Sequence, residues 1–308
     1  MEADLADRLD GAPELRLASY TYREVFGQPP ARVWRVPGTI ALLADGPRRL
    51  TVTARWGAIV AAGPLPDGII ELMRMNRPDE RLRLTVDEAA AGGGPAWAAD
   101  GLRSARHGAA LLVNTDLPEG SGVGATEATQ VAIRLALRDL AGPGQPAACP
   151  QAGDPGADHS GGHEPGTAML GHRRLPCDPA AAGLRLAIID TRVRGTAPPP
   201  ITEQSPVEAA AAALEAGRIE ALGPMLTAAH AALAPDEVQD VAVSAALGAG
   251  ALGARMIVDS PGRPVLALLP AQLLPEVRTA VSAAFAAGGF RPPRFLTVSP
   301  AGGAHRAA

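Results

Sequence analysis

The feature that constrains this chain most is a strand, a glycine-rich loop and a helix in direct succession. A continuous apolar run at 109–113 leads into Pro-Glu-Gly-Ser-Gly-Val-Gly-Ala-Thr at 118–126. A helical pattern follows and ends at Gly142-Pro143; its apolar residues are Val131, Ile133, Leu135, Leu137 and Leu140. Glycines before a helix N-terminus expose backbone N–H groups that suit an anion. The pattern fits both a phosphate-binding loop and an ordinary strand-to-helix turn.

The segments on either side predict two groups of strands and helices. Before the glycine loop, a short helix precedes strands at 33–36, 40–43, 50–54, 58–61, 69–73 and 82–86, a pattern typical of a meandering sheet. After it we expect strands at 184–189, 255–258, 265–269 and 295–299, and an irregular stretch at 195–200. Helices are expected within 206–233, split at Gly217 and at Gly223-Pro224, and at 235–248 and 273–287. Because helices separate most of these strands, the second half predicts a layered α/β lobe rather than a barrel.

Residues 142–166 separate the two groups and have a different composition. Glycine and proline, 35 and 30 residues of 308, are common throughout the chain, but here no aliphatic residue is larger than alanine. Such a segment cannot bury enough surface to offset its ordering entropy. We therefore expect an N-terminal lobe at 1–141, a flexible insertion at 142–166 and a C-terminal lobe at 167–308.

The charge pattern excludes several classes of function. All 28 basic residues are arginines, and the formal net charge is −4. Without lysine, the chain cannot form a Schiff base or place the phosphate-binding lysine of a Walker motif or protein kinase. The arginines form no run of four, so no nucleic acid or anionic membrane is expected as a partner. A protein partner is left open.

Two cysteines, Cys149 and Cys177, are too few for a disulfide framework or a zinc ribbon. The first twenty residues contain no apolar core of a signal peptide, and no uninterrupted apolar window of about 18 residues follows. These observations favour a cytoplasmic protein that neither is exported nor spans a membrane.

Several strings resemble the galactokinase branch of the GHMP small-molecule kinases, in particular its actinobacterial members. They are Val-Trp-Arg-Val-Pro-Gly at 33–38, Asn-Thr-Asp-Leu-Pro-Glu-Gly-Ser-Gly-Val at 114–123, Ile-Ile-Asp-Thr-Arg at 188–192, Gly-Ala-Leu-Gly-Ala-Arg-Met at 250–256 and Phe-Arg-Pro-Pro-Arg-Phe-Leu-Thr-Val-Ser-Pro at 290–300. The resemblance implies an α+β fold of two lobes with the ligand cleft between them. It also implies ATP and Mg²⁺ as cofactors and phosphorylation of the anomeric hydroxyl of galactose.

In the phosphate loop that the resemblance implies, Gly120 and Gly122 keep the glycines, while Gly124, Ala125 and Thr126 stand where the family has small hydroxyl residues. Gly120, Gly122, Gly124 and Thr126 are thus the candidate nucleotide-binding residues, and Thr126 is the candidate hydroxyl near Mg²⁺. Glu127 adds a negative charge where the family has a small residue, which either weakens a nucleotide loop or simply favours a helix N-terminus.

The first family motif is altered at both of its functional positions. Thr39 falls where the family has its catalytic arginine, so a neutral hydroxyl replaces a fixed positive charge. Asp45 falls at the family's glutamate and is the candidate sugar contact. The His-Thr-Asp-Tyr-Asn string that grips the sugar in the family has no counterpart. Arg48 and Arg49 follow at once, and we interpret them as a solvated turn rather than an anion contact.

Two further motifs are also altered. Glu164 falls at the family's catalytic aspartate, but glycine and proline surround it, so a fixed geometry is not expected there. The third glycine motif is replaced by a segment that contains Asp259 and Pro261, and proline removes a donor N–H.

An alternative constellation of metal-ligating side chains lies in and near the insertion. A zinc or nickel site would need a helix to align them, which glycine and proline interrupt, so a solvated linker is favoured. The residues are Cys149, Asp154, Asp158, His159, His163, Glu164 and His172. His107 and His230 are interpreted as structural histidines.

Three hypotheses follow. The chain is a galactokinase-like pseudoenzyme with lost or severely weakened ATP-dependent sugar phosphorylation, an active small-molecule kinase, or a relic under weak constraint. The first is favoured, because four motifs are altered together and single losses of electrostatic stabilisation already cost about 10²–10³ in rate.

Overall fold

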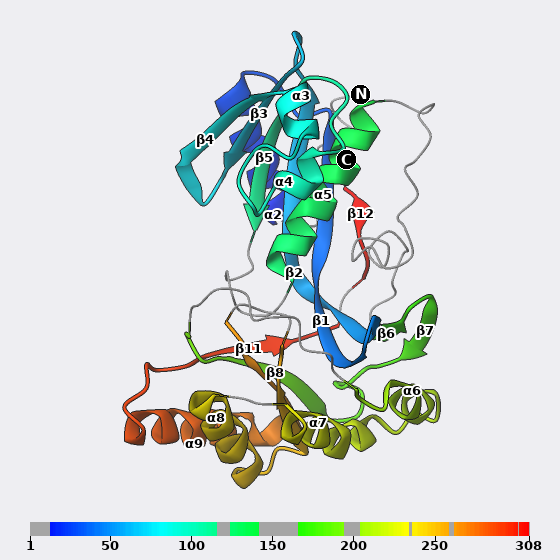
Figure 1. The fold of residues 1–308 in the computed structure, drawn as a ribbon, viewed down its shortest axis with the longest axis vertical. Helices are drawn as coiled ribbons and strands as arrows, with labels where there is room; N and C mark the ends of the chain where they lie inside the picture. Colours follow the sequence, from blue (N-terminus) through cyan, green and yellow to red (C-terminus); the bar gives the residue numbers. More distant parts are fainter. Residues whose placement is uncertain are drawn as a thin grey trace.

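The structure is a computed structural model that describes residues 13–115, 124–141, 166–193, 204–233, 236–258, 262–300 and 302–307. It has two lobes, each built on one sheet, with a long hairpin extending from the first lobe to the second (Figure 1). The expected insertion at 142–166 lies outside the described residues except for Gly166.

The first lobe contains most of the larger sheet. Its elements are α2 (Pro13–Phe26), β1 (Arg32–Asp45), β2 (Arg48–Pro64), β3 (Ile69–Arg74), β4 (Arg77–Thr85), α3 (Val86–Ala90), α4 (Ala99–Leu102), β5 (Ala109–Thr115) and α5 (Ala125–Leu140). The strand order is β12-β1-β2-β5-β3-β4, and only β3 and β5 pair in parallel. Helix α5 packs on β1 and β2, and α2 covers β2 and β5. The two helices belong to different buried clusters, so the sheet is covered on both faces.

Two pairs of predicted strands are each one continuous strand. The segments at 33–36 and 40–43 belong to β1, and those at 50–54 and 58–61 belong to β2. Gly57 lies opposite Pro37, and a Cβ atom on Gly57 would come within 2.2 Å of the Val36 carbonyl oxygen. Because glycine permits this close approach and a bulge follows Pro37, the residues that were expected to end the strands instead lie within them.

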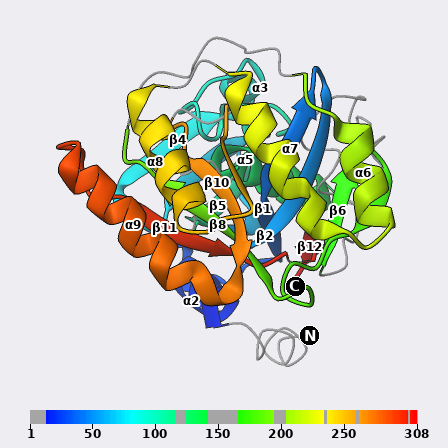
Figure 2. The ribbon, with the colours of Figure 1, turned by 90° about the horizontal axis from the view of Figure 1, so that it is seen from below.

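The second lobe is built on a four-stranded antiparallel sheet. The elements of this half of the chain are β6 (Thr167–Leu170), β7 (Arg173–Pro176), β8 (Leu184–Asp190), α6 (Val207–Glu215), η2 (Ile219–Ala221), α7 (Leu222–Ala231), α8 (Glu237–Gly248), β9 (Gly253–Met256), β10 (Val265–Pro270), η3 (Ala271–Leu273), α9 (Leu274–Ala287), β11 (Arg294–Val298) and β12 (His305–Arg306). The strand order is β11-β8-β10-β9. Helices α8 and α9 pack against each other on one face of this sheet, and α7 packs along its edge strand β9 (Figure 2).

The predicted layered lobe is confirmed, but one helix boundary is wrong. Gly223 and Pro224 do not divide two helices; both lie in the first turn of α7. A proline is tolerated there because the first backbone N–H groups of a helix have no partner within the helix.

The second sheet is buried on both faces. On β10, Val265, Ala267 and Leu269 pack with α8 and α9, while Leu266 and Leu268 belong to the core that continues into the first lobe. Alternate side chains of a strand point to opposite faces, so this apolar run serves both layers.

Elements from late in the sequence complete the larger sheet. Strand β6 pairs with β2, with Ala168 opposite Val52, and β7 pairs with β6. Strand β12 pairs with β1 at Trp34 and Arg35. The chain therefore returns to the first sheet twice after leaving it.

Candidate functional site

Thr39 and Gly124, two of the predicted site residues, lie against each other. Gly124 precedes α5 with a left-handed φ of 63°. A Cβ atom on it would lie 3.0 Å from the carbonyl oxygen and 3.1 Å from the amide nitrogen of Thr39. The end of the predicted phosphate loop thus packs on the strand that carries the family's arginine position.

The N-terminus of α5 retains features of an anion site. Gly124, which caps this helix, has no side chain to bond the first N–H groups, and its carbonyl accepts from the Ala128 N–H at 2.9 Å. Thr126 is exposed beside this end, and Glu127 lies in the first turn. Gly120 and Gly122 lie outside the described residues. The first-turn N–H groups favour an anion, whereas the carboxylate of Glu127 opposes one.

Asp45 is the last residue of β1, at the turn into β2. It forms a backbone bridge with Gln204, and the Ser205 N–H donates to the Ala44 carbonyl at 2.9 Å. Asp45 lies six positions along the extended strand from Thr39, a span of about 20 Å. Two positions that far apart do not both contact one sugar ring.

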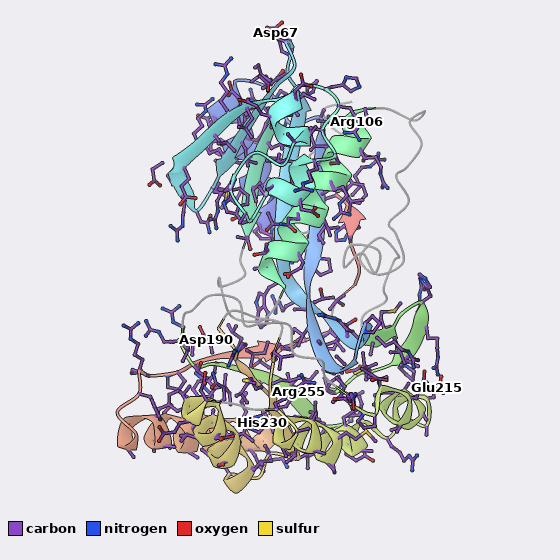
Figure 3. All side chains as sticks on the ribbon, in the orientation of Figure 1. Asp67, Arg106, Asp190, Glu215, His230 and Arg255 are labelled. Carbon is purple, nitrogen blue, oxygen red and sulfur yellow. The ribbon has the colours of Figure 1, made fainter. Side chains whose placement is uncertain are left out.

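An ionic network holds this hairpin end against the second lobe. Glu208 on α6 pairs with Arg48 of the hairpin and, at 2.7 Å, with Arg173 on β7. Arg173 also pairs with Glu215 at 2.8 Å, near the end of α6 (Figure 3). Hydrogen bonds from Arg48 and Arg173 lower the pKa of Glu208 below its ordinary value. Arg48 therefore pairs with a carboxylate of the protein itself, and residues 46–49 of the turn are exposed.

Arg255 on β9 is a buried charged residue that the sequence did not predict at the contact between the two lobes. It is 1 % exposed, and its guanidinium donates to the carbonyls of Leu42, at 2.9 Å, and Met256, at 3.0 Å. Arg255 lies between the lobes and close to His230 (Figure 3). An arginine inside an apolar strand was the available signal, since charged residues are rarely buried without partners.

His230 is buried and bonded on both ring nitrogens, and it has the structural role expected of it. Its Nδ1 lies 3.2 Å from the Met256 amide and its Nε2 lies 3.0 Å from Asp240. His107 is exposed. His172 is exposed at the turn between β6 and β7.

The remaining predicted positions are not described. Glu164, Asp259 and Pro261 lie outside the described residues, as do the metal candidates other than His172. Within the described ranges no three histidine, cysteine, aspartate or glutamate side chains are placed to share a metal ion. The Thr191 hydroxyl lies 3.4 Å from the Gly262 carbonyl, which places the end of the altered third motif beside the end of β8. That these segments all border one cleft stays a prediction.

No family model matches the chain. A galactokinase of Streptomyces coelicolor is 27% identical over 92% of this chain and 96% of its own length. Their alignment covers 373 positions, more than the 308 residues of this chain, so the relative contains segments that have no counterpart here.

Solved structures show the same fold. Lactococcus lactis galactokinase, complexed with galactose, superposes with a TM-score of 0.77 at 18% identity, covering 94% of this chain and 99% of that one. Homoserine kinase from Cytophaga hutchinsonii has a TM-score of 0.58 at 19% identity, covering 89% and 96%. Among the described residues no helix is both long and apolar enough to cross a membrane. The chain is a homologue of galactokinase and has the two-lobed α+β fold of the GHMP kinases.

Proposed function

We propose that this galactokinase-like chain is a pseudoenzyme, which retains the kinase scaffold and has lost, or retains only weakly, ATP-dependent sugar phosphorylation. Its function is then to bind a ligand or a protein partner. The observation that carries the proposal is the β1–β2 hairpin, which turns directly at Gly46-Pro47 where the family has its sugar-gripping string.

The hairpin supports the proposal because a sugar site discriminates through buried polar groups that only the correct hydroxyls satisfy. Here the hairpin end is bonded to Ser205 and to the Glu208 network. Both connect it to the second lobe. The polar groups at this end are therefore used for contacts within the protein.

The change at Thr39 supports the proposal independently. Phosphoryl transfer relies on positioning and on stabilising the charge that develops on the transferred group. A threonine supplies no positive charge. Arg255 contacts the carbonyl of Leu42, three residues after Thr39 on β1. Its guanidinium, however, already donates to two backbone carbonyls, those of Leu42 and Met256.

A second candidate function is an active kinase for galactose or another small molecule. The packing of Gly124 against Thr39 and the position of both at the N-terminus of α5 favour it, because the phosphates of a nucleotide suit the N–H groups at a helix N-terminus. In that case Gly120, Gly122, Gly124 and Thr126 would hold ATP, the Thr126 hydroxyl would face Mg²⁺, and Asp45 and Glu164 would be the candidate sugar contact and base. Mg²⁺ would neutralise phosphate charge when bound.

The two candidates are separated by a coupled assay of ADP release with Mg²⁺-ATP and galactose. We expect a rate indistinguishable from the no-sugar background. Turnover of about 1 per second or faster, abolished by Glu164→Ala, would overturn the pseudoenzyme and establish the active kinase.

A thermal-shift screen with Mg²⁺-nucleotides and free sugars then identifies what the scaffold binds. A ligand at about 100 times its Kd stabilises the folded state by about 2.7 kcal/mol. A shift with nucleotide but without turnover indicates a nucleotide-binding pseudoenzyme, and no shift with any compound directs the search to protein partners.

A further inference from the structure

Strand β9 is an edge strand of the second sheet, and two side chains of helix α7 accept hydrogen bonds from its outward N–H groups. The Ala254 N–H donates to the Thr227 hydroxyl at 3.4 Å, and the Met256 N–H donates to His230 Nδ1 at 3.2 Å. Thr227 and His230 are three residues apart and therefore share one face of the helix. The four-residue strand β9 is thus bonded to one side chain that titrates, His230, and to one that does not, Thr227.

The hydrogen bonds fix the protonation state of His230. Nδ1 accepts from the Met256 amide and so carries no proton. Nε2 carries the proton and donates to Asp240 Oδ1 at 3.0 Å. His230 is thus neutral in this arrangement, with its side chain 7% exposed. A second proton has no place except Nδ1, where it would oppose the Met256 N–H.

The same strand reaches the first lobe through Arg255. Arg255 precedes Met256, and its guanidinium bridges the Met256 carbonyl and the Leu42 carbonyl on the edge of β1. His230 thus contacts the residue next to the arginine that joins the lobes (Figure 3). Displacement of β9 would move this guanidinium away from β1.

We propose that His230 is an acid-sensitive latch, which holds β9 in place while neutral and, through Arg255, keeps the second lobe on the edge of β1. Protonation at Nδ1 removes the acceptor of the Met256 N–H and places two positive charges side by side. The latch is independent of nucleotide or sugar binding, so its test needs no activity.

The sign of the pH dependence follows from the groups that face His230. Burial lowers its pKa from 6.5; Asp240 on α8 raises it and Arg255 on β9 lowers it further, and the net shift is downward. The unfolded chain therefore binds this proton more readily than the folded one. The stability contributed by the latch is fully present above about pH 6.5 and is lost as pH falls through the pKa of the folded state.

Hydrogen exchange measured by mass spectrometry tests the latch on the full chain. Between pH 7.5 and 5, after correction for intrinsic exchange, we expect the peptide containing 253–256 to exchange about fivefold faster, which corresponds to one lost hydrogen bond. The peptide containing 40–45 should change with it. An unchanged rate for the β9 peptide would refute the proposal.

Three variants separate the latch from general acid sensitivity. His230→Asn keeps an acceptor near the position of Nδ1 and does not titrate, so the acid response should vanish. Asp240→Asn removes the charge that favours protonation and should move the response to lower pH. The matched control, His172→Asn, changes an exposed histidine and should respond like the wild type. A His230→Asn protein with the wild-type acid response would contradict the proposal.

A direct measurement on the unmodified protein does not depend on whether a variant folds. Nitrogen-detected NMR of the histidine side chains should show His230 with a protonated Nε2 and an unprotonated Nδ1 at pH 7.5. Finding the proton on Nδ1 would exclude the latch, because Nδ1 could not then accept from Met256.

Discussion

The middle of β1, at Thr39, and its C-terminal end, at Asp45, are held by different kinds of contact. Near Thr39 the strand packs closely against Gly124 at the start of α5, where a Cβ atom on Gly124 would lie 3.0 Å from the Thr39 carbonyl oxygen. At Asp45 the strand runs into a two-residue turn that is fastened to α6 and β7 by Arg48, Glu208 and Arg173.

The two regions therefore differ in how much stability a substitution should cost. Close packing of backbone on backbone tolerates little change without loss of stability. Exposed polar groups carry little stability and can be exchanged freely. Substitutions near Thr39 should therefore cost more stability than substitutions at the hairpin end.

The largest effect is expected from the packing at Gly124. Gly124→Ala adds a Cβ atom within about 3 Å of the Thr39 backbone at a left-handed position, and should lower the free energy of unfolding by about 2–3 kcal/mol. Gly46→Ala is the matched control, since Gly46 has a φ of 57° but open space around its Cβ position, and should cost about 1 kcal/mol. Urea denaturation of both variants measures the comparison, and equal losses would show that the Thr39 contact contributes nothing.

A smaller effect is expected from the ionic network at the hairpin end. Glu208→Gln removes the partner of both Arg48 and Arg173, while Glu215→Gln removes one partner of Arg173 only. The denaturation midpoint should fall slightly for Glu208→Gln and less for Glu215→Gln, and both differences should disappear in 1 M salt because exposed pairs are screened.

The pH dependence of the stability of Glu208→Gln tests whether its effect is electrostatic. The pKa of Glu208 is lowered in the folded state, so its contribution is present above the pKa of an unfolded glutamate and is lost as pH falls through the folded value. Wild type and Glu208→Gln should therefore converge in stability at acidic pH. A difference that persists there would assign the effect to packing.

The smallest effect is expected from restoring the missing charge alone. Thr39→Arg should leave galactose-dependent ADP release at background, because catalytic groups that act as a unit do not contribute additively. The sugar-binding string would still be absent. If this single change produced turnover, the hairpin end would not be what prevents catalysis.

Local patterns in the sequence predicted most helices and strands, because apolar periodicity and turn residues act over a few positions. They also favoured a structural role for His230, whose ring is buried and hydrogen-bonded. The resemblance to galactokinases, and not these patterns, singled out Thr39 and Asp45, whose roles stay predictions. Local patterns wrongly predicted a break within β1 and another within β2. Proline and glycine usually end strands, and only the pairing of Pro37 with Gly57 across the hairpin shows that both lie inside one.

The sequence by itself determined most helices and strands, since these follow from residues close together along the chain. Its resemblance to galactokinases implied the two-lobed α+β fold and placed Thr39 at the family's arginine position. Only the tertiary structure decided that Glu208 closes the hairpin end, that β6 joins the first sheet, and that Arg255 finds its partner at Leu42, 213 residues away. These contacts join segments far apart in sequence, and a buried arginine or an exposed glutamate does not specify its distant partner until packing of the two lobes brings them together.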